Sequence, residues 1–163
     1  MSKRVYVRID NRLLHGQVVQ FWIPHLNIEK LVVADDEVFG NEAMQTIYRL
    51  ALPTHVSLSV MPVSRLVSEL DALGDMTSLV LVRTIEDMKR AVESGCRITD
   101  FMIGNVHASP DRSRVTDAVY LSEREIEILS ELKESGIEIE IQTFPGETLR
   151  FSVVDGGYKW SRC

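Results

Sequence analysis

The alternation of short apolar runs with amphipathic helical segments limits how this chain can fold more than any other feature of its sequence. The apolar runs cover residues 4–9, 30–34, 56–61, 78–82, 100–103, 118–121 and 137–142. Such runs are typical of strands buried on both faces, and an intervening helix allows successive strands to lie parallel. The pattern therefore predicts a single-domain, doubly wound α/β fold. We expect a mostly parallel sheet of about six to seven strands, with helices on both faces.

Residues that begin and end helices lie between these runs. The expected N-caps are Asn41, Ser64, Thr84 and Ser122, and Glu125 completes a capping box with Ser122. Residues 137–142 alternate isoleucine with glutamate or glutamine, so one face of that strand is polar and we place it at a sheet edge. The pattern weakens after residue 146, and residues 151–163 are expected to form a C-terminal tail that packs on the domain or stays loose.

Composition and charge argue against several classes of protein. The chain has 163 residues, of which 45% are hydrophobic, which is enough for one ordinary core without disulfides. Its net charge of −6 argues against a nucleic-acid partner, because phosphate backbones are bound by clustered Lys and Arg. Two cysteines and an N-terminus without an apolar stretch favour a reduced, cytoplasmic setting.

The most informative stretch follows the first predicted strand. Arg8, Asp10, Arg12 and His15 lie within eight residues, and Gly16 and Gln17 come next. In open α/β sheets, ligands bind beyond the carboxyl ends of the strands. A neutral histidine is a nucleophile, and arginines with N–H groups of a helix N-terminus stabilise a transferring phosphoryl group. From these residues alone, His15 in a solvated loop with ordinary ion pairs around it is an equal alternative.

Residues 8–18, Arg-Ile-Asp-Asn-Arg-Leu-Leu-His-Gly-Gln-Val, resemble the active-site loop of a known family. That family comprises the IIB components of the mannose/fructose/sorbose family of the phosphoenolpyruvate-dependent sugar phosphotransferase system. Residues 30–36 and 101–107 also resemble segments of that family, and the resemblance covers about residues 3–150. We therefore expect a IIB-type domain over residues 1–150, followed by the tail at 151–163. The loop at 104–111 departs from the family in its glycine and lysine content.

The resemblance implies a function and a set of partners. His15 would accept a phosphoryl group on Nδ1 from the phosphohistidine of a IIA protein or domain. It would then transfer the group to a sugar imported through membrane IIC and IID subunits. The chain would therefore act in the cytoplasm, peripherally associated with the membrane transporter. The matching residues Arg8, Asp10, Arg12, Gly16 and Gln17 would bind or support the phosphoryl group. The alternatives are a phosphorylated regulatory module that reports sugar supply, and a plain ligand-binding domain without covalent phosphate.

The remaining polar residues carry weaker expectations. Asp35 and Asp36 follow the second strand and Asn105 and His107 follow the fifth, so all four are candidates to line the same crevice. For Asp35 and Asp36, charges at a helix entry are an equal alternative. His25 and His55 are expected to be surface residues. No spacing indicates a metal site and no glycine-rich nucleotide motif occurs, so we expect neither metal nor cofactor. An apolar edge near Trp22 or in the tail is the expected place for contacts in a homo-oligomer.

Overall fold

A computed structural model describes residues 4–163. Residues 1–3 lie outside the described residues. They include the start of the domain predicted over residues 1–150 and the start of the N-terminal stretch that has no apolar segment. The main sheet contains eight strands: β1 (Val5–Asp10), β2 (Lys30–Ala34), β3 (Ser57–Met61), β4 (Ser78–Val82), β5 (Asp100–Asn105), β8 (Glu138–Ile141), β9 (Leu149–Val154) and β10 (Gly157–Arg162). Their order is β10-β9-β8-β5-β1-β4-β2-β3. β6 (Arg112–Arg114) and β7 (Tyr120–Ser122) form a separate antiparallel pair.

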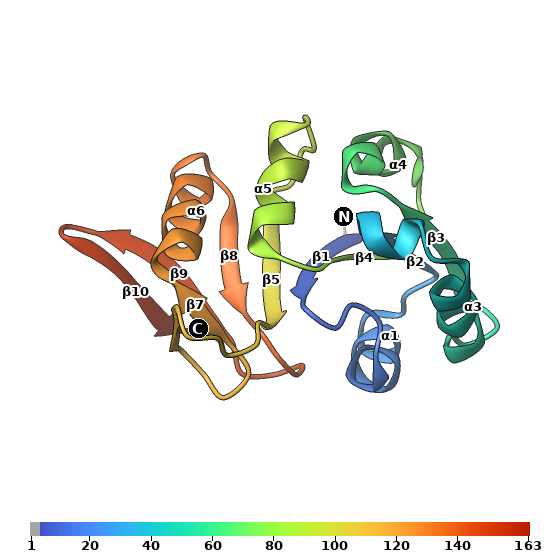
Figure 1. Cartoon of the computed structure of the whole chain (residues 1–163), viewed down its shortest axis with the longest axis horizontal. Coiled ribbons are helices and arrows are strands. Elements are labelled where there is room, and N and C mark those ends of the chain that lie inside the picture. Colours follow the sequence, from blue (N-terminus) through green and yellow to red (C-terminus); the bar gives the residue numbers. More distant parts are fainter. Residues whose placement is uncertain (1–3) are drawn as a thin grey trace.

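Helices cover both faces of this sheet, as Figure 1 shows. α4 (Leu66–Ala72), α5 (Ile85–Glu93) and α6 (Glu123–Glu134) pack on one face, where a core cluster includes Val7, Ile9 and Phe151. α1 (Ile23–Leu26) and α3 (Glu42–Ala51) pack on the other face, with a second cluster around Trp22. Short helical segments complete the chain: η1 (Val18–Trp22), α2 (Asp36–Phe39) and η2 (Val63–Arg65). The predicted single-domain, mostly parallel α/β fold is confirmed.

The strand predictions are correct for six of the seven runs, and those six form the parallel part of the sheet. The run at 118–121 overlaps β7 in the small separate sheet, whereas β9 and β10 were not predicted as strands. The main sheet therefore has eight strands instead of six to seven. The placement of 137–142 at a sheet edge is wrong, because β8 pairs with β5 and with β9. Its polar residues mark a solvated face, where Glu140 forms an ion pair with Arg150 at 3.2 Å.

The last residues form a hairpin that continues the sheet. β9 runs antiparallel to β8, and β10 returns along β9 after the turn at Asp155 and Gly156. Gly156 has φ +81°, which an L side chain rarely adopts. Phe151 of β9 is completely buried and its ring contacts the Trp160 ring at 4.9 Å between centroids. The boundary expected after residue 150 falls inside β9.

Three of the four expected N-caps form. The side chains of Asn41, Thr84 and Ser122 accept hydrogen bonds from backbone N–H groups in the first turns of their helices. Ser122 and Glu125 form the complete capping box. Ser64 is not a cap, since it lies inside η2 and the chain enters α4 without a side-chain cap.

The two serines give a matched test of helix capping. We expect Ser122→Ala to lower the free energy of unfolding by about 1 kcal/mol, because a backbone donor of α6 loses its acceptor in a buried setting. Ser64→Ala should change it by less than about 0.5 kcal/mol, since Ser64 is exposed and caps nothing. Urea denaturation followed by circular dichroism measures both values. Equal losses in the two variants would contradict the assignment of the cap.

Candidate functional site

The site is built where β1 ends between β4 and β5, in the middle of the sheet. The β1–β5 register shifts at Ile9 and Asp10, and the chain then turns sharply into the helical segment that contains η1. Leu13 in this turn is completely buried and has φ 54°, a strained value for leucine. The carbonyl of His15 accepts hydrogen bonds from the N–H groups of Val18 and Val19. His15 therefore stands at the start of the helix, at the carboxyl edge of the sheet.

The His15 ring is oriented by Asp10. The two side chains come from the same loop, and His15 Nε2 lies 2.8 Å from Asp10 Oδ2. The His15 side chain is 13% exposed, whereas that of Asp10 is completely buried. A carboxylate at Nε2 favours the tautomer that carries its proton there, which leaves the lone pair on Nδ1. Nδ1 has no hydrogen-bond partner among residues 4–163.

Asp10 is held as a carboxylate by several donors. Asn105 Nδ2 donates to Oδ2 at 2.8 Å and the Arg12 N–H donates to Oδ1 at 3.0 Å. Burial alone would raise the pKa of Asp10, but the hydrogen bonds from His15, Asn105 and the Arg12 backbone, with the Arg8 charge, lower it below its usual value. Asp10 is thus ionised and able to stabilise positive charge on the His15 ring.

Arg8 lies beneath the site and supports it. Its side chain is completely buried, and its guanidinium donates to the carbonyls of Gln142 and Thr143 and to Gln17 Oε1. The guanidinium also lies over the Trp22 ring, 4.9 Å from its centroid. Burial lowers the pKa of Arg8 to about 10, even though Asp10 opposes this shift. Arg8 fixes Gln17 and balances the charge of Asp10, 3.5 Å away, but does not reach the surface.

Three other residues of the predicted loop flank His15 in the chain and offer hydrogen-bond donors that are not used within the described residues. Arg12 is exposed, and its guanidinium has no hydrogen-bond or ion-pair partner in the described chain. The N–H groups of Gly16 and Gln17 likewise have no acceptor within residues 4–163. The Gln17 side chain, by contrast, points inward and accepts from both Arg8 and Asn105. One exposed cation and two backbone donors are therefore available in the loop that carries the imidazole.

The four candidates from the other loops separate into two groups. Asn105 is buried at the centre of the site, where it bonds Asp10 and Gln17. The His107 N–H bonds Asn11, so this exposed loop also borders the site. Asp35 instead caps α2 and binds Arg83 through two hydrogen bonds of 3.0 and 2.8 Å. Asp36 is half-exposed and binds Arg90 of α5, as expected of a charge at a helix entry.

Sequence reasoning missed Asn11 and Arg83. Asn11 joins three strand-end loops: its Nδ2 donates to the carbonyl of Arg83, its Oδ1 accepts from His107, and its N–H bonds the carbonyl of Asn105. Arg83 directly follows β4 and is held by Asp35 at this same edge. The position of each residue directly after a strand, Asn11 after β1 and Arg83 after β4, was a usable signal.

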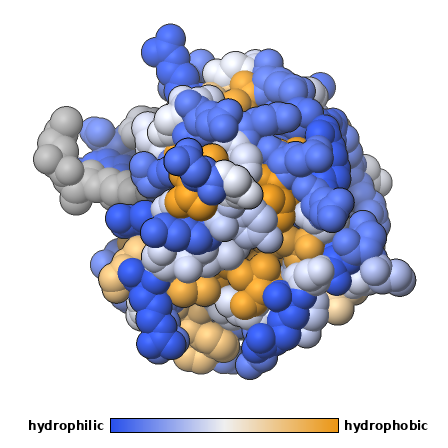
Figure 2. Space-filling view, turned by 90° about the vertical axis from the view of Figure 1, so that its left-hand side faces the viewer, coloured by the Kyte–Doolittle hydropathy of each residue, from blue (hydrophilic) through white to orange (hydrophobic). Residues whose placement is uncertain are grey.

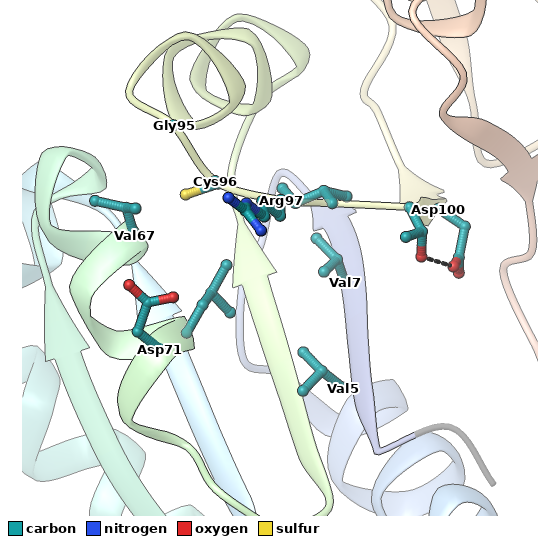
Figure 3. Close-up of a pocket in the computed structure, with 11 residues that line it drawn as sticks. Val5, Val7, Val67, Asp71, Gly95, Cys96, Arg97 and Asp100 are labelled. Carbon is teal, nitrogen blue, oxygen red and sulfur yellow. Dashed lines mark hydrogen bonds between the residues drawn. The ribbon is translucent and has the colours of Figure 1, made fainter. Parts of the chain in front are cut away.

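A pocket of about 590 Å³ lies at the opposite edge of the sheet. Figure 3 shows its lining, which includes Val5, Val7, Asp71, Cys96 and Arg97. These residues come from the start of β1, from α4 and from the loop before β5, so none of the predicted site residues reaches this pocket.

Within residues 4–163, no group of three or more His, Cys, Asp or Glu side chains is arranged to hold a metal ion. No helix in that range is long and apolar enough to cross a membrane.

Comparison with known proteins identifies the family of the chain. The model of the family described as PTS system sorbose subfamily IIB component matches residues 4–150. The chain belongs to this family. The match includes β1, the His15 loop and every parallel strand of the sheet.

Individual IIB relatives cover most of the chain. The N-acetylgalactosamine-specific phosphotransferase enzyme IIB component 1 of Escherichia coli (strain K12) is 28% identical over 86% of this chain and 90% of its own length. The mannose-specific EIIAB component of the same organism is 30% identical over 83% of this chain, which spans only 42% of that relative. The structure of an N-acetyl-galactosamine IIB component from Streptococcus pyogenes matches with a TM-score of 0.81 and 25% identity, covering 89% of this chain and 91% of the other.

Proposed function

We propose that His15 carries a phosphoryl group on Nδ1, received from the phosphohistidine of a IIA partner. The group is then passed to a sugar held by membrane IIC and IID subunits, with the chain acting in the cytoplasm at the transporter. The single observation that supports this most is the contact of His15 Nε2 with the buried carboxylate of Asp10. It leaves the partly exposed ring with a nucleophilic Nδ1 at the edge where ligands of α/β sheets bind.

The transfer can be written with its charges and bonds in balance. The Nδ1 lone pair attacks the phosphorus, the phosphorus–nitrogen bond to the donor histidine breaks, and that bonding pair remains on the donor ring. The donor ring leaves as a neutral imidazole because its other nitrogen carries a proton, while the His15 ring keeps its Nε2 proton and becomes a cation paired with the Asp10 carboxylate. Arg12 and the N–H groups of Gly16 and Gln17 are placed to stabilise the negative oxygens. In the second step a sugar hydroxyl oxygen attacks the phosphorus, its proton is lost to a base or water, and Nδ1 regains its lone pair.

Intact-mass spectrometry tests the proposal directly. The chain is incubated with phosphoenolpyruvate, the general phosphotransferase proteins and a IIA protein. We expect the addition of one phosphoryl group that is labile in acid, stable in base, and located on His15 by fragmentation. No added mass, or phosphate on another residue, would reject the assignment. Transfer of the label to sugar in membranes with IIC and IID tests the second step.

The orientation of His15 by Asp10 leads to a separate prediction. Asp10→Asn keeps the size of the side chain but removes the charge that fixes the proton on Nε2. We expect the rate of phosphoryl acceptance to fall by about 10²-fold or more, since a misplaced tautomer presents the wrong nitrogen. Stopped-time labelling with a phosphorylated IIA protein measures the rate.

A control distinguishes orientation from a general loss of charge. Asp36→Asn removes a carboxylate from a neighbouring loop that pairs with Arg90 instead of His15. This variant should accept phosphate at a rate within about two-fold of the unmodified chain. Nuclear magnetic resonance of the His15 ring should also show the Nε2–H tautomer in the unmodified chain and a mixture in Asp10→Asn. An unchanged tautomer would contradict the role given to Asp10.

A further inference from the structure

β10 is an edge strand whose outer side is unpaired within the described chain. It ends the strand order of the main sheet, and all six of its residues are at least partly exposed. Val153, Val154 and Tyr158 of this hairpin are among the exposed large apolar residues, at 39–45%. Figure 2 looks onto this end of the molecule and shows hydrophobic surface between hydrophilic side chains. Such an edge is a template for pairing with another strand.

The pairing with β9 fixes which backbone groups of β10 point outward. The Cys163 N–H donates to the carbonyl of Thr148 at 3.2 Å, just beyond the paired residues Arg162 and Leu149. Because bonded positions alternate along an antiparallel ladder, the odd-numbered residues of β10 bond β9. The N–H and C=O groups of Tyr158, Trp160 and Arg162 therefore point away from the sheet.

A second copy of β10 can use all three of these residues in only one antiparallel register. Trp160 then faces Trp160 of the second copy, and Tyr158 faces Arg162 in both directions. Each of these pairs exchanges two backbone hydrogen bonds, which gives about six bonds in all. A slip of one residue would place the outward N–H and C=O groups of one copy opposite odd-numbered residues of the other copy, whose backbone groups already bond β9. A slip of two residues in either direction leaves only two bonded pairs within β10.

The side chains favour the same register. Tyr158 and Trp160 share the face of Phe151, with ring centroids 5.7 and 4.9 Å from it. The pairing would extend this aromatic row across the dimer axis and place the Arg162 guanidinium beside Tyr158. Lys159 would face the neutral Ser161. A slip of two residues towards the turn would set Lys159 against Lys159 of the second copy, and like charges directly opposite are destabilising.

We propose that β10 is the interface of a homodimer, with Trp160 facing Trp160 across the two-fold axis, so that two sheets join into one. Three strands, β9, β8 and β5, separate β10 from the strand that leads to His15. The interface therefore leaves both His15 sites open, and it does not depend on the proposed function. One pair of six-residue strands is smaller than a standard interface, so the association is weak and depends on concentration.

Two measurements test the proposal. Sedimentation velocity of the full chain from about 5 to 500 µM should show the average mass rising towards twice that of one chain. A single-chain mass throughout this range would overturn the proposal. The second measurement is disulfide crosslinking after mild oxidation, in a Cys163→Ser background so that the exposed native thiol does not interfere. It maps the register and does not require the dimer to be abundant.

In that background Trp160→Cys should give crosslinked dimers, because the two Cα atoms would lie about 5.5 Å apart. Lys159→Cys is the matched control one residue away, and it should crosslink at least ten-fold less, because it faces Ser161 instead of itself. Crosslinking at Lys159→Cys that equals or exceeds that at Trp160→Cys would overturn the register. Absence of crosslinks at both positions would overturn the interface.

Discussion

His15→Ala should take up no phosphoryl group from a phosphorylated IIA protein, while its circular dichroism spectrum stays that of the unmodified chain. The expected loss is complete because no other described side chain places a nucleophilic nitrogen against Asp10. The fold should survive because the Asp10 carboxylate keeps its bonds from Asn105 and the Arg12 backbone after the imidazole is removed. Acid-labile phosphate is measured by intact mass after a fixed incubation.

Two further variants make this result specific. His107→Ala removes a neighbouring exposed histidine whose contact to Asn11 is made by its backbone, so phosphorylation should persist. His15→Gln keeps a polar side chain of similar length and should still accept nothing, because an amide nitrogen is not a nucleophile at neutral pH. Acid-labile label on His15→Ala would mean that the accepting residue lies elsewhere.

The parallel part of the fold could be predicted because its strands are buried on both faces. All five residues of β4 are buried, and a strand of this kind can be recognised in the sequence as a continuous apolar run. β9 and β10 could not be found in the same way. Their polar residues, such as Ser152 and Lys159, alternate with apolar ones, and two glycines follow the turn residue Asp155. An exposed hairpin of this kind resembles a loose tail in composition.

For the site, the sequence could indicate which residues gather but not always where they point. The carboxyl ends of β1 and β5 are adjacent, which is why Asp10 and Asn105 meet although they are far apart in the chain. The sequence also predicts that the Arg8 and Asp10 side chains lie on the same face of the sheet, because alternate residues of a strand share a face. Only the packing against Trp22 establishes that this face is buried.

Neighbouring residues can differ in burial and in their ion-pair partners, and the sequence does not decide which residue takes which partner. Asp35 is buried and bound to Arg83, whereas Asp36 is exposed and bound to Arg90. Both carboxylates begin the same short helix, and either side chain is suited to capping it. The choice depends on arginines that follow β4 and lie in α5, whose positions are set by the tertiary fold.

Gly104→Ala should be among the most destabilising single methyl additions in the chain. A Cβ at residue 104 would lie 2.1 Å from Arg8 Cζ, far inside contact distance. The Arg8 side chain has no room to retreat because it is completely buried and bonded to the Gln142 and Thr143 carbonyls. Moving it breaks charged hydrogen bonds and leaves Asp10 without its buried counter-charge, so we expect a loss of about 3 kcal/mol or more in the free energy of unfolding.

A double-mutant cycle separates this clash from the general cost of adding a methyl group. In an Arg8→Met background the guanidinium is absent, so adding Gly104→Ala should cost less than about 1 kcal/mol, and the coupling between the two positions should be large. Gly16→Ala is the matched control, because a Cβ there meets no atom within 4 Å. Equal costs of Gly104→Ala in both backgrounds would mean that Arg8 does not fill the space above Gly104. Urea denaturation of the variants decides between these outcomes, since only a bound guanidinium at that position makes the cost of the methyl group depend on residue 8.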